Sequence, residues 1–212
     1  MAKRIGLATL CVVLFAILIF LVTWASSKKR DALALSTVKV LVGEGHGSGV
    51  HTGNRYIITA AHVVGQAETV KVKTSRGDEA EADVLWINKA HDIALLRARS
   101  LPSVNVSRID CASIGVGQHI EAVGNPGPLE FIHAFGRVSS GIEKRGPWAQ
   151  AYIVSMTVAG GMSGGPAFDA QGKVVGIVVG VALTQIGFMP SALAFAYVVP
   201  SKTVCNLIMR SA

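Results

Sequence analysis

The chain is dominated by short apolar or alternating runs of four to nine residues, which follow one another from residue 37 to residue 199. Clusters of Gly, Asn, Asp and Ser separate the runs, a pattern typical of β-strands joined by turns. The predicted strands cover residues 37–42, 55–59, 69–74, 82–87, 93–98, 119–124, 131–139, 149–156, 165–168, 174–181 and 192–199. Because no helical segments alternate with them, the pattern disfavours a parallel sheet and predicts an all-β architecture of barrels or a sandwich.

The predicted strands form two series, separated by a less regular stretch at residues 99–117. We therefore expect one folded body over residues 36–203, with a first half at about 36–117 and a second at about 118–200. Residues 201–210 have a helical pattern, which predicts a C-terminal helix within residues 201–212. Only 12 residues follow Pro200, so we expect no further domain after the body.

An apolar segment precedes this body. Residues 5–25 contain no charge and are rich in Leu, Ile, Val and Phe, and their 21 residues match the length of a helix that spans a bilayer. The alternative is a cleaved signal peptide, but its apolar region usually has about 7 to 15 residues, so we favour an uncleaved anchor over residues 1–25. Residues 26–35 are expected to be a linker.

The charges of the chain argue against a nucleic-acid-binding protein. The formal net charge is +7, but five of the basic residues flank the apolar segment. From residue 32 onward, 15 Lys and Arg residues face 12 Asp and Glu residues, and they are scattered. The body therefore lacks the basic patch that contacts phosphates. Because basic residues lie on both flanks of the apolar segment, charge alone does not determine its orientation in a membrane.

Three cysteines are too few for a disulfide framework or a structural metal site. Cys11 lies in the apolar segment, whereas Cys111 and Cys205 lie in the body. We expect Cys111 and Cys205 to be two separate small residues in the core, and a disulfide between them is the alternative in an oxidising compartment.

A serine among four glycines is the strongest chemical feature of the sequence. Residues 160–166 read GGMSGGP, with Ser163 directly before a predicted strand. Glycines allow positive φ and a close approach to a ligand, so successive N–H groups can point at one position. Acyl transfer needs such donors, because they stabilise the negative charge of the tetrahedral intermediate. The alternative is a glycine-rich turn with an incidental serine.

A serine hydroxyl needs a base to remove its proton. His62 is the best candidate, because a buried strand runs into the small residues before it, which can form a helical turn that exposes the imidazole. The other histidines are expected to be structural or exposed; His46 and His51 flank a Gly-Ser-Gly sequence that we interpret as a turn, and the remaining three are His91, His119 and His133. No metal-ligand spacing such as HExxH is present, so we expect no metal site.

Asp92 begins the otherwise apolar run DIALL. A carboxylate there can accept a hydrogen bond from Nδ1–H of a histidine, which fixes the tautomer and stabilises the imidazolium formed during attack. An aspartate at the start of a strand is also ordinary turn chemistry, so this feature gains weight only together with His62 and Ser163.

The sequences TAAHVV, HDIALLRA and GGMSGGPAF, in the order His, Asp, Ser, resemble those of the chymotrypsin-like serine proteases, also called trypsin-like. The HtrA/DegP branch is the most similar, without its PDZ domain. The resemblance covers residues 38–203 and extends to further segments: GSGV at 47–50, AVGNP at 122–126, GRVS at 136–139, DAQG at 169–172, VGI at 175–177 and FAYVVP at 195–200.

The resemblance implies two packed six-stranded β-barrels, with His62 and Asp92 in the first and Ser163 in the second. The backbone N–H groups of Gly161 and Ser163 would form the oxyanion hole. One departure is Met162, since the family usually has Asn or Asp before the serine. This leaves open whether the loop is set for catalysis.

The resemblance also implies a primary specificity pocket, lined by Thr157 and by Val178, Val179 and Val181 of a later strand. These residues include no acid, so we do not expect cleavage after Lys or Arg. An apolar, shallow pocket favours small aliphatic residues before the scissile bond.

We therefore predict a serine endopeptidase that needs no cofactor and acts on polypeptides, including unfolded or misfolded ones. It would be a single-pass membrane protein with a periplasmic or otherwise extracytoplasmic body, and a homo-oligomer is compatible with the resemblance. A catalytically silent module that binds peptides in the same cleft is the alternative, and a structural membrane protein is a second one.

Overall fold

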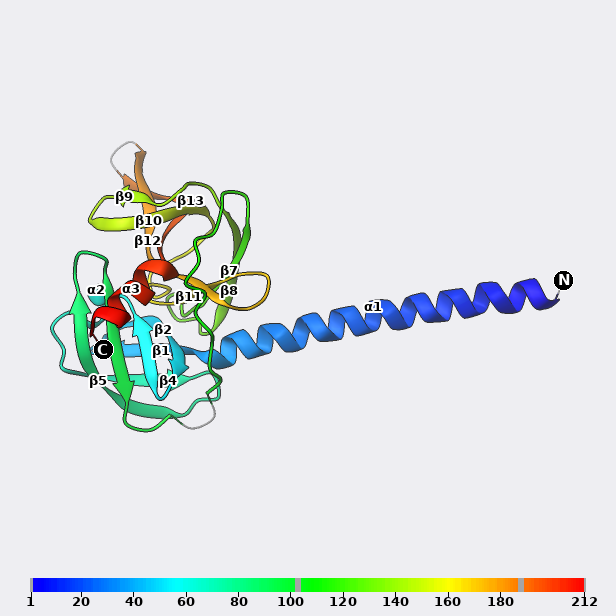
Figure 1. Ribbon diagram of the computed structural model, residues 1–212, viewed down its shortest axis with the longest axis horizontal. Helices are drawn as coiled ribbons and strands as arrows, with labels where there is room; N and C mark the ends of the chain where they lie inside the picture. The colour runs from blue at the N-terminus through cyan, green and yellow to red at the C-terminus, as the bar shows by residue number, and fades with distance from the viewer. Residues whose placement is uncertain (1, 102–103, 187–188, 212) are drawn as a thin grey trace. The chain divides into compact units, whose positions relative to one another are not determined.

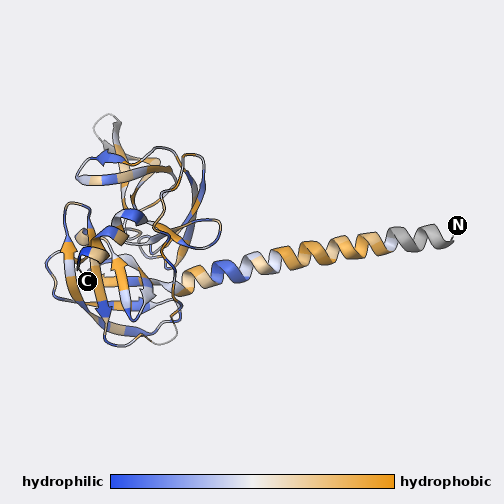
Figure 2. Cartoon of the chain, viewed as in Figure 1, coloured by the Kyte–Doolittle hydropathy of each residue, from blue (hydrophilic) through white to orange (hydrophobic). Residues whose placement is uncertain are grey.

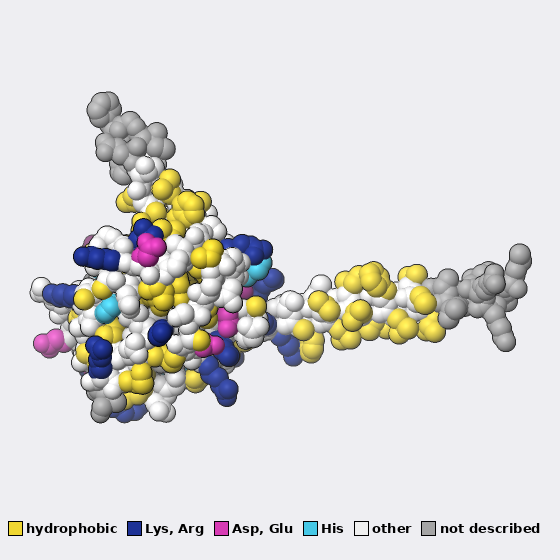
Figure 3. All heavy atoms as spheres, turned by 45° about the horizontal axis from the view of Figure 1, so that its top comes forward, with side chains coloured by type: hydrophobic (Ala, Val, Ile, Leu, Met, Phe, Trp, Pro, Cys, Tyr) yellow, Lys and Arg dark blue, Asp and Glu magenta, His cyan; other side chains and the backbone are white. Residues whose placement is uncertain are grey.

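The computed structural model describes residues 2–101, 104–186 and 189–211, which separate into two compact units, residues 1–32 and 33–212. Helix α1, Ala2–Ser36, provides the first unit. Its stretch Thr9–Ser36 is long and apolar enough to cross a membrane, judged by length and composition. The large apolar side chains from Leu10 to Trp24 are solvent-exposed. Figure 2 colours this stretch as hydrophobic, and Figure 3 shows its hydrophobic side chains on the surface. Residues 26–35, predicted as a linker, are helical as well.

The first half of the second unit is a closed antiparallel barrel with the strand order β1-β2-β3-β6-β5-β4 (Figure 1). Its strands are β1 Thr37–Val42, β2 Gly45–Gly53, β3 Tyr56–Thr59, β4 Thr69–Thr74, β5 Glu79–Asn88 and β6 Ile93–Ala98. The one-turn helix α2, Ala61–Val64, follows β3. The barrel closes through antiparallel pairing of β1 with β4. Alternation directs one face of each strand inward: in β4 the valines Val70 and Val72 are buried, and Lys71 between them faces solvent.

The second half repeats this architecture. Its strands are β7 His119–Gly124, β8 Ile132–Val138, β9 Glu143–Arg145, β10 Trp148–Ser155, β11 Pro166–Phe168, β12 Val174–Ile186 and β13 Met189–Pro200. Six of them form a ring, because the sheet β13-β12-β11-β7-β8-β10 closes through pairing of β10 with β13, and β9 adds to the outer side of β10. The predicted all-β fold of two six-stranded barrels is therefore confirmed.

Helix α3, Ser201–Ser211, is the predicted C-terminal helix. It packs against β12 and β13, and the hydroxyl of Ser201 donates to the carbonyl oxygen of Asp110 in the segment between the barrels. The two cysteines expected to be separate are joined here: Cys111 and Cys205 form a disulfide across 94 positions of the chain. That expectation was wrong, because the fold brings the segment between the barrels against α3.

The interpretation of the Gly-Ser-Gly sequence as a turn was also wrong, since it lies inside β2. Glycine in a strand interior usually marks a close approach of backbone. Gly47 fits this, because an added Cβ would lie 2.5 Å from the Val63 side chain and 3.0 Å from the carbonyl oxygen of Ser163. The absence of a side chain at Gly47 thus allows β2 of the first barrel to approach the Ser163 loop of the second barrel.

Candidate active site

Ser163 lies in the loop between β10 and β11, at the junction of the two barrels. Gly161 and Gly164 on either side of it have φ values of +98° and +85°. A Cβ at Gly164 would lie 2.1 Å from the carbonyl oxygen of Ser48, and one at Gly161 would lie 2.2 Å from that of Asn125. Both positions therefore require glycine, for conformation and for space.

Hydrogen bonds orient three successive peptide groups of this loop. The carbonyl oxygens of Gly160, Gly161 and Met162 accept, respectively, from Gly127 N–H at 2.9 Å, the Ser48 hydroxyl at 2.8 Å and Gly165 N–H at 3.0 Å. In a trans peptide the C=O and N–H point in opposite directions. The N–H groups of Gly161 and Ser163 are therefore turned away from these partners, and within the described residues neither donates a hydrogen bond.

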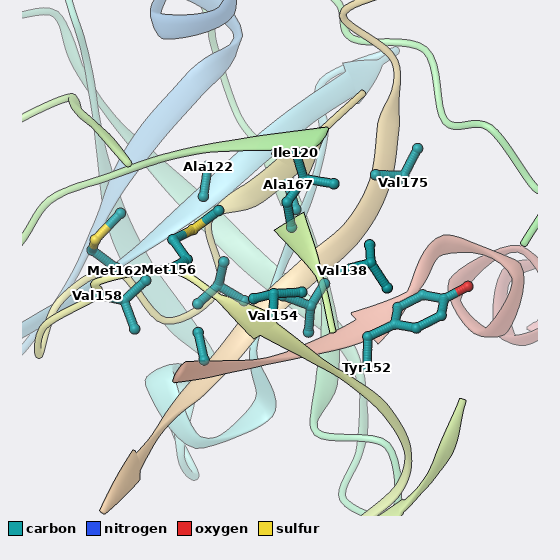
Figure 4. Close-up of a cluster of buried hydrophobic side chains, with 13 residues drawn as sticks. Ile120, Ala122, Val138, Tyr152, Val154, Met156, Val158, Met162, Ala167 and Val175 are labelled. Atoms are coloured by element: carbon teal, nitrogen blue, oxygen red, sulfur yellow. The ribbon is translucent and has the colours of Figure 1, made fainter. Parts of the chain in front are cut away.

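Met162, whose presence left the loop geometry open, has its side chain inside the second barrel. It is 2% exposed and belongs to a cluster with Met156, Val158 and Ala122 (Figure 4). Its backbone N–H donates to the carbonyl oxygen of Ala159 at 3.1 Å. The methionine thus anchors the loop in the core, and its side chain does not lie among the donors around Ser163.

His62 and Asp92 form a directly hydrogen-bonded pair in the first barrel. His62 lies on α2, with Nδ1 at 2.7 Å from Oδ2 of Asp92, and its backbone N–H donates to Oδ1 at 2.8 Å. Asp92 is 8% exposed and precedes β6 directly, with φ +55°, a conformation rare for residues other than glycine. Its carboxylate is therefore held through both oxygens, and the imidazole of His62 is half-exposed.

A cavity of about 540 Å³ brings the proposed reacting groups together. His62, Ser163, Gly160 and Gly161 all line it, as does His46, whose Nε2 lies 2.9 Å from the carbonyl oxygen of Asn125. Among the residues that the structure describes, the Ser163 hydroxyl forms no hydrogen bond with His62. Such bonds often tighten only when substrate binds.

The four residues predicted to line one specificity pocket lie in three places. Thr157 lines a cavity of about 320 Å³ beside Met162, whereas Val179 lines a cavity of about 590 Å³ together with His62 and Asp92. Val178 and Val181 belong to the core of the second barrel. Because successive residues of a strand face opposite sides, Val178 and Val179 do not share one pocket wall.

The remaining histidines lie away from Ser163. Nδ1 of His51 contacts the carbonyl oxygen of Asn105 at 2.9 Å, and His133 pairs with Glu121 at 2.6 Å on adjacent strands. Burial, and secondarily the charge of Arg210, lower the pKa of His91, while His119 is exposed on β7. Within the described ranges, no three His, Cys, Asp or Glu side chains gather as metal ligands.

Sequence reasoning missed the residues that connect the two barrels at the site. The fully buried Ser48 of β2 accepts hydrogen bonds at 3.0 Å from both the backbone and the side-chain amide of Asn125, besides donating to Gly161. The Ser48 N–H donates to the carbonyl oxygen of Ser163 at 2.8 Å. A serine between two glycines, in the segment before the histidine strand, was the available signal.

Trp148 is the second missed residue. Its indole Nε1–H donates to Oδ2 of Asp92 at 3.0 Å, from the start of β10 in the other barrel. The sequence around Trp148 offers no signal for this contact, since 56 positions separate the two residues.

Comparison with known proteins shows the family of the chain. The family described as "Trypsin-like peptidase domain" matches residues 47–177. Two relatives named "Probable periplasmic serine endoprotease DegP-like" are 31% identical over 175 residues, from Ectopseudomonas mendocina (strain ymp), and 32% identical over 174 residues, from Brucella suis biovar 1 (strain 1330). The alignments cover 80% and 76% of this chain but only 34% and 32% of the relatives, so the chain spans about a third of their length.

Solved structures show the same fold. The inactive form of a serine-to-alanine mutant of Rv3671c from M. tuberculosis H37Rv has a TM-score of 0.72 at 24% identity, covering 86% of this chain and 89% of that one. The HtrA-type protease AlgW, solved with a tripeptide, has a TM-score of 0.74 at 20% identity, covering 86% of this chain and 62% of that one.

Proposed function

Because this chain belongs to the trypsin-like peptidase family, we propose that it is a serine endopeptidase with Ser163 as nucleophile, His62 as general base and Asp92 as the carboxylate that orients the histidine. One observation supports this most: His62, which is hydrogen-bonded to Asp92, lines the same cavity as Ser163 and Gly161, whose N–H groups donate to no protein acceptor among the described residues.

The reaction is acyl transfer. Nε2 of His62 takes the hydroxyl proton of Ser163 as its Oγ attacks the carbonyl carbon of the scissile peptide, and the N–H groups of Gly161 and Ser163 stabilise the oxyanion. His62 then gives the proton to the leaving amine, and the acyl-enzyme forms. Water attacks the ester through the same base and releases the acid. Asp92 stabilises the imidazolium in both steps, because its Oδ2 accepts from Nδ1.

For the substrate, we propose small aliphatic residues before the scissile bond. The cavity that Thr157 lines is walled by Pro126, Ile132, Ala134, Phe135 and Met162, with His133 as its only titratable lining residue among those described. No carboxylate there would pair with a basic side chain. Profiling a peptide library with the full chain tests this, and a preference for Lys, Arg or large aromatic residues at that position would refute it.

A fluorophosphonate probe and cleavage of unfolded casein test the activity. The full chain in detergent is expected to be labelled and to cleave, and Ser163→Ala and His62→Ala are expected to lose both. Ser155→Ala and His119→Ala are matched controls, since both residues are exposed and outside the site, and they should keep activity. If the wild type neither labels nor cleaves but still binds the unfolded polypeptide, the peptide-binding module is the correct function.

We further propose that residues 5–25 anchor the chain in a membrane and that the body, residues 36–203, lies outside the cytoplasm. The disulfide between Cys111 and Cys205 favours an oxidising compartment. Protease protection in intact and permeabilised cells tests the side, and carbonate extraction tests whether the anchor is retained. Crosslinking of the full chain tests the homo-oligomer that the resemblance suggests.

A further inference from the structure

The structure points to Trp148 as a positioning residue that holds the carboxylate of Asp92 from the opposite barrel, an inference that rests on the proposed function. The indole Nε1–H of Trp148 donates to Oδ2 of Asp92 at 3.0 Å. The same oxygen lies 2.7 Å from Nδ1 of His62, and Oδ1 takes the backbone N–H of His62 at 2.8 Å. The carboxylate thus has three donors, and Trp148 is the one that the second barrel provides.

The second barrel fixes the indole ring. It packs against the ring of Tyr197 on β13, with centroids 4.8 Å apart. Gly180 on β12 makes room for it, because a Cβ there would lie 2.7 Å from the indole. The N–H of the next residue, Ala149, donates to the carbonyl oxygen of Ala90 at 2.9 Å, two positions before Asp92. The donor is therefore held rigidly against the carboxylate.

Trp148 adds a second donor at Oδ2 of Asp92, while the backbone N–H of His62 donates to Oδ1. An indole has one donor and no acceptor, so its N–H can only donate to the carboxylate. With Oδ2 shared between Trp148 and His62, rotation of the carboxylate would break both bonds. Trp148 also lines the cavity of about 590 Å³ that His62 and Asp92 line, together with Pro147, Val179 and the charged Lys89.

Substitution by phenylalanine separates the hydrogen bond from packing. In the full chain, Trp148→Phe removes the N–H and keeps a ring against Tyr197. Hydrogen bonds to charged groups are worth about 10- to 100-fold in an equilibrium or rate, so kcat is expected to fall by about that factor with KM little changed. Trp86→Phe is the matched control, since Nε1 of Trp86 is buried without a partner among the described residues, and it should leave kcat within about twofold.

Nuclear magnetic resonance of the indoles measures the contact without relying on activity. The chain has three tryptophans, so ¹⁵N-indole labelling of the full-length Ser163→Ala protein gives three signals, assigned by Trp24→Phe, Trp86→Phe and Trp148→Phe. The Trp148 signal is expected to lie downfield and to move with pH together with the ring signals of His62, and Asp92→Asn should abolish this linkage.

Two results would overturn the inference: a folded Trp148→Phe protein with wild-type kcat, or a Trp148 signal that stays fixed while His62 titrates. A different result separates the proposed function from the contact. If the wild type does not cleave while the Trp148 signal follows His62, the contact stands and the serine endopeptidase is refuted.

Discussion

The hydroxyl of Ser48 donates a hydrogen bond to the carbonyl oxygen of Gly161 at 2.8 Å, across the junction of the two barrels. Since the peptide group between Gly161 and Met162 is thereby oriented, a residue of the first barrel determines the shape of the loop that carries Ser163. The loop is therefore set by the packing of the two barrels as well as by its own glycines.

Ser48→Ala should impair activity more than the small change in side-chain volume suggests. The substitution leaves the backbone N–H of Asn125 without its acceptor at a fully buried position, and the side-chain amide keeps only its longer bond to the carbonyl oxygen of Val38 at 3.5 Å. This costs about 1–3 kcal/mol in the free energy of unfolding. Misplacement of the Gly161 donor is expected to lower kcat/KM by about 100-fold. Thermal melts and casein cleavage measure the two effects. Ser107→Ala is the control: it removes a buried hydrogen bond to Ser36 and should cost stability alone.

Met162→Asp should destabilise the second barrel. Although the family usually has Asn or Asp at this position, the Met162 side chain is buried here among Met156 and Val158, and an unpaired buried carboxylate costs several kcal/mol. We expect the urea midpoint to fall strongly, whereas Met209→Asp on the exposed side of α3 should change it little. A Met162→Asp protein as stable as the wild type would show that the side chain can leave the core.

Asp92→Asn and Asp92→Ala should differ in stability while both lose activity. Asn tolerates the left-handed conformation that Asp92 adopts at φ +55°, whereas Ala lacks that tolerance and should cost about 1 kcal/mol more in unfolding free energy. Because Asn does not fix the tautomer of His62 as the carboxylate does, kcat should fall by about 10⁴-fold. Melting curves and steady-state kinetics of both variants provide the comparison.

Removal of the disulfide should destabilise the body. It closes a loop across 94 positions between Cys111 and Cys205, so replacing both by serine is expected to cost about 2–5 kcal/mol. Reductant should lower the urea midpoint of the wild type and leave that of the double variant unchanged. Cys11→Ser, outside the body, is the control. Equal midpoints of the wild type with and without reductant would mean that the bond contributes nothing.

Glu130 should make the body sensitive to acid. Hydrogen bonds from Lys73, and then from Lys39, lower the pKa of Glu130. A carboxyl group with a lowered pKa contributes stability above the pKa of the unfolded chain, and this contribution is lost as pH falls through the folded pKa. Because the group is partly exposed, the contribution is about 0.5 kcal/mol. In thermal melts from pH 7 to 3, Glu130→Gln should reduce the loss of stability on acidification by this amount. The exposed Glu44→Gln should leave that loss unchanged.

Local pattern was enough to predict most of the fold. In β4 and β6 the predicted residues coincide with the observed strands. Neighbouring positions alone show the alternation of buried and exposed side chains in β4 and the mostly apolar run of β6. The same holds for α2, where small residues after a strand form the turn that exposes His62. β2 was missed because its glycines, which let other segments approach, remove the alternation that marks a strand.

The sequence by itself determined most of the strands, the two halves and the family, and thereby the candidates Ser163, His62 and Asp92. Only the tertiary structure decided that Met162 points into the core, that Cys111 pairs with Cys205, and that Trp148 reaches Asp92. The physical reason is the separation along the sequence. Periodicity over neighbouring residues encodes which face of an element is buried. Contacts across 56 or more positions depend on how the two folded barrels pack against each other.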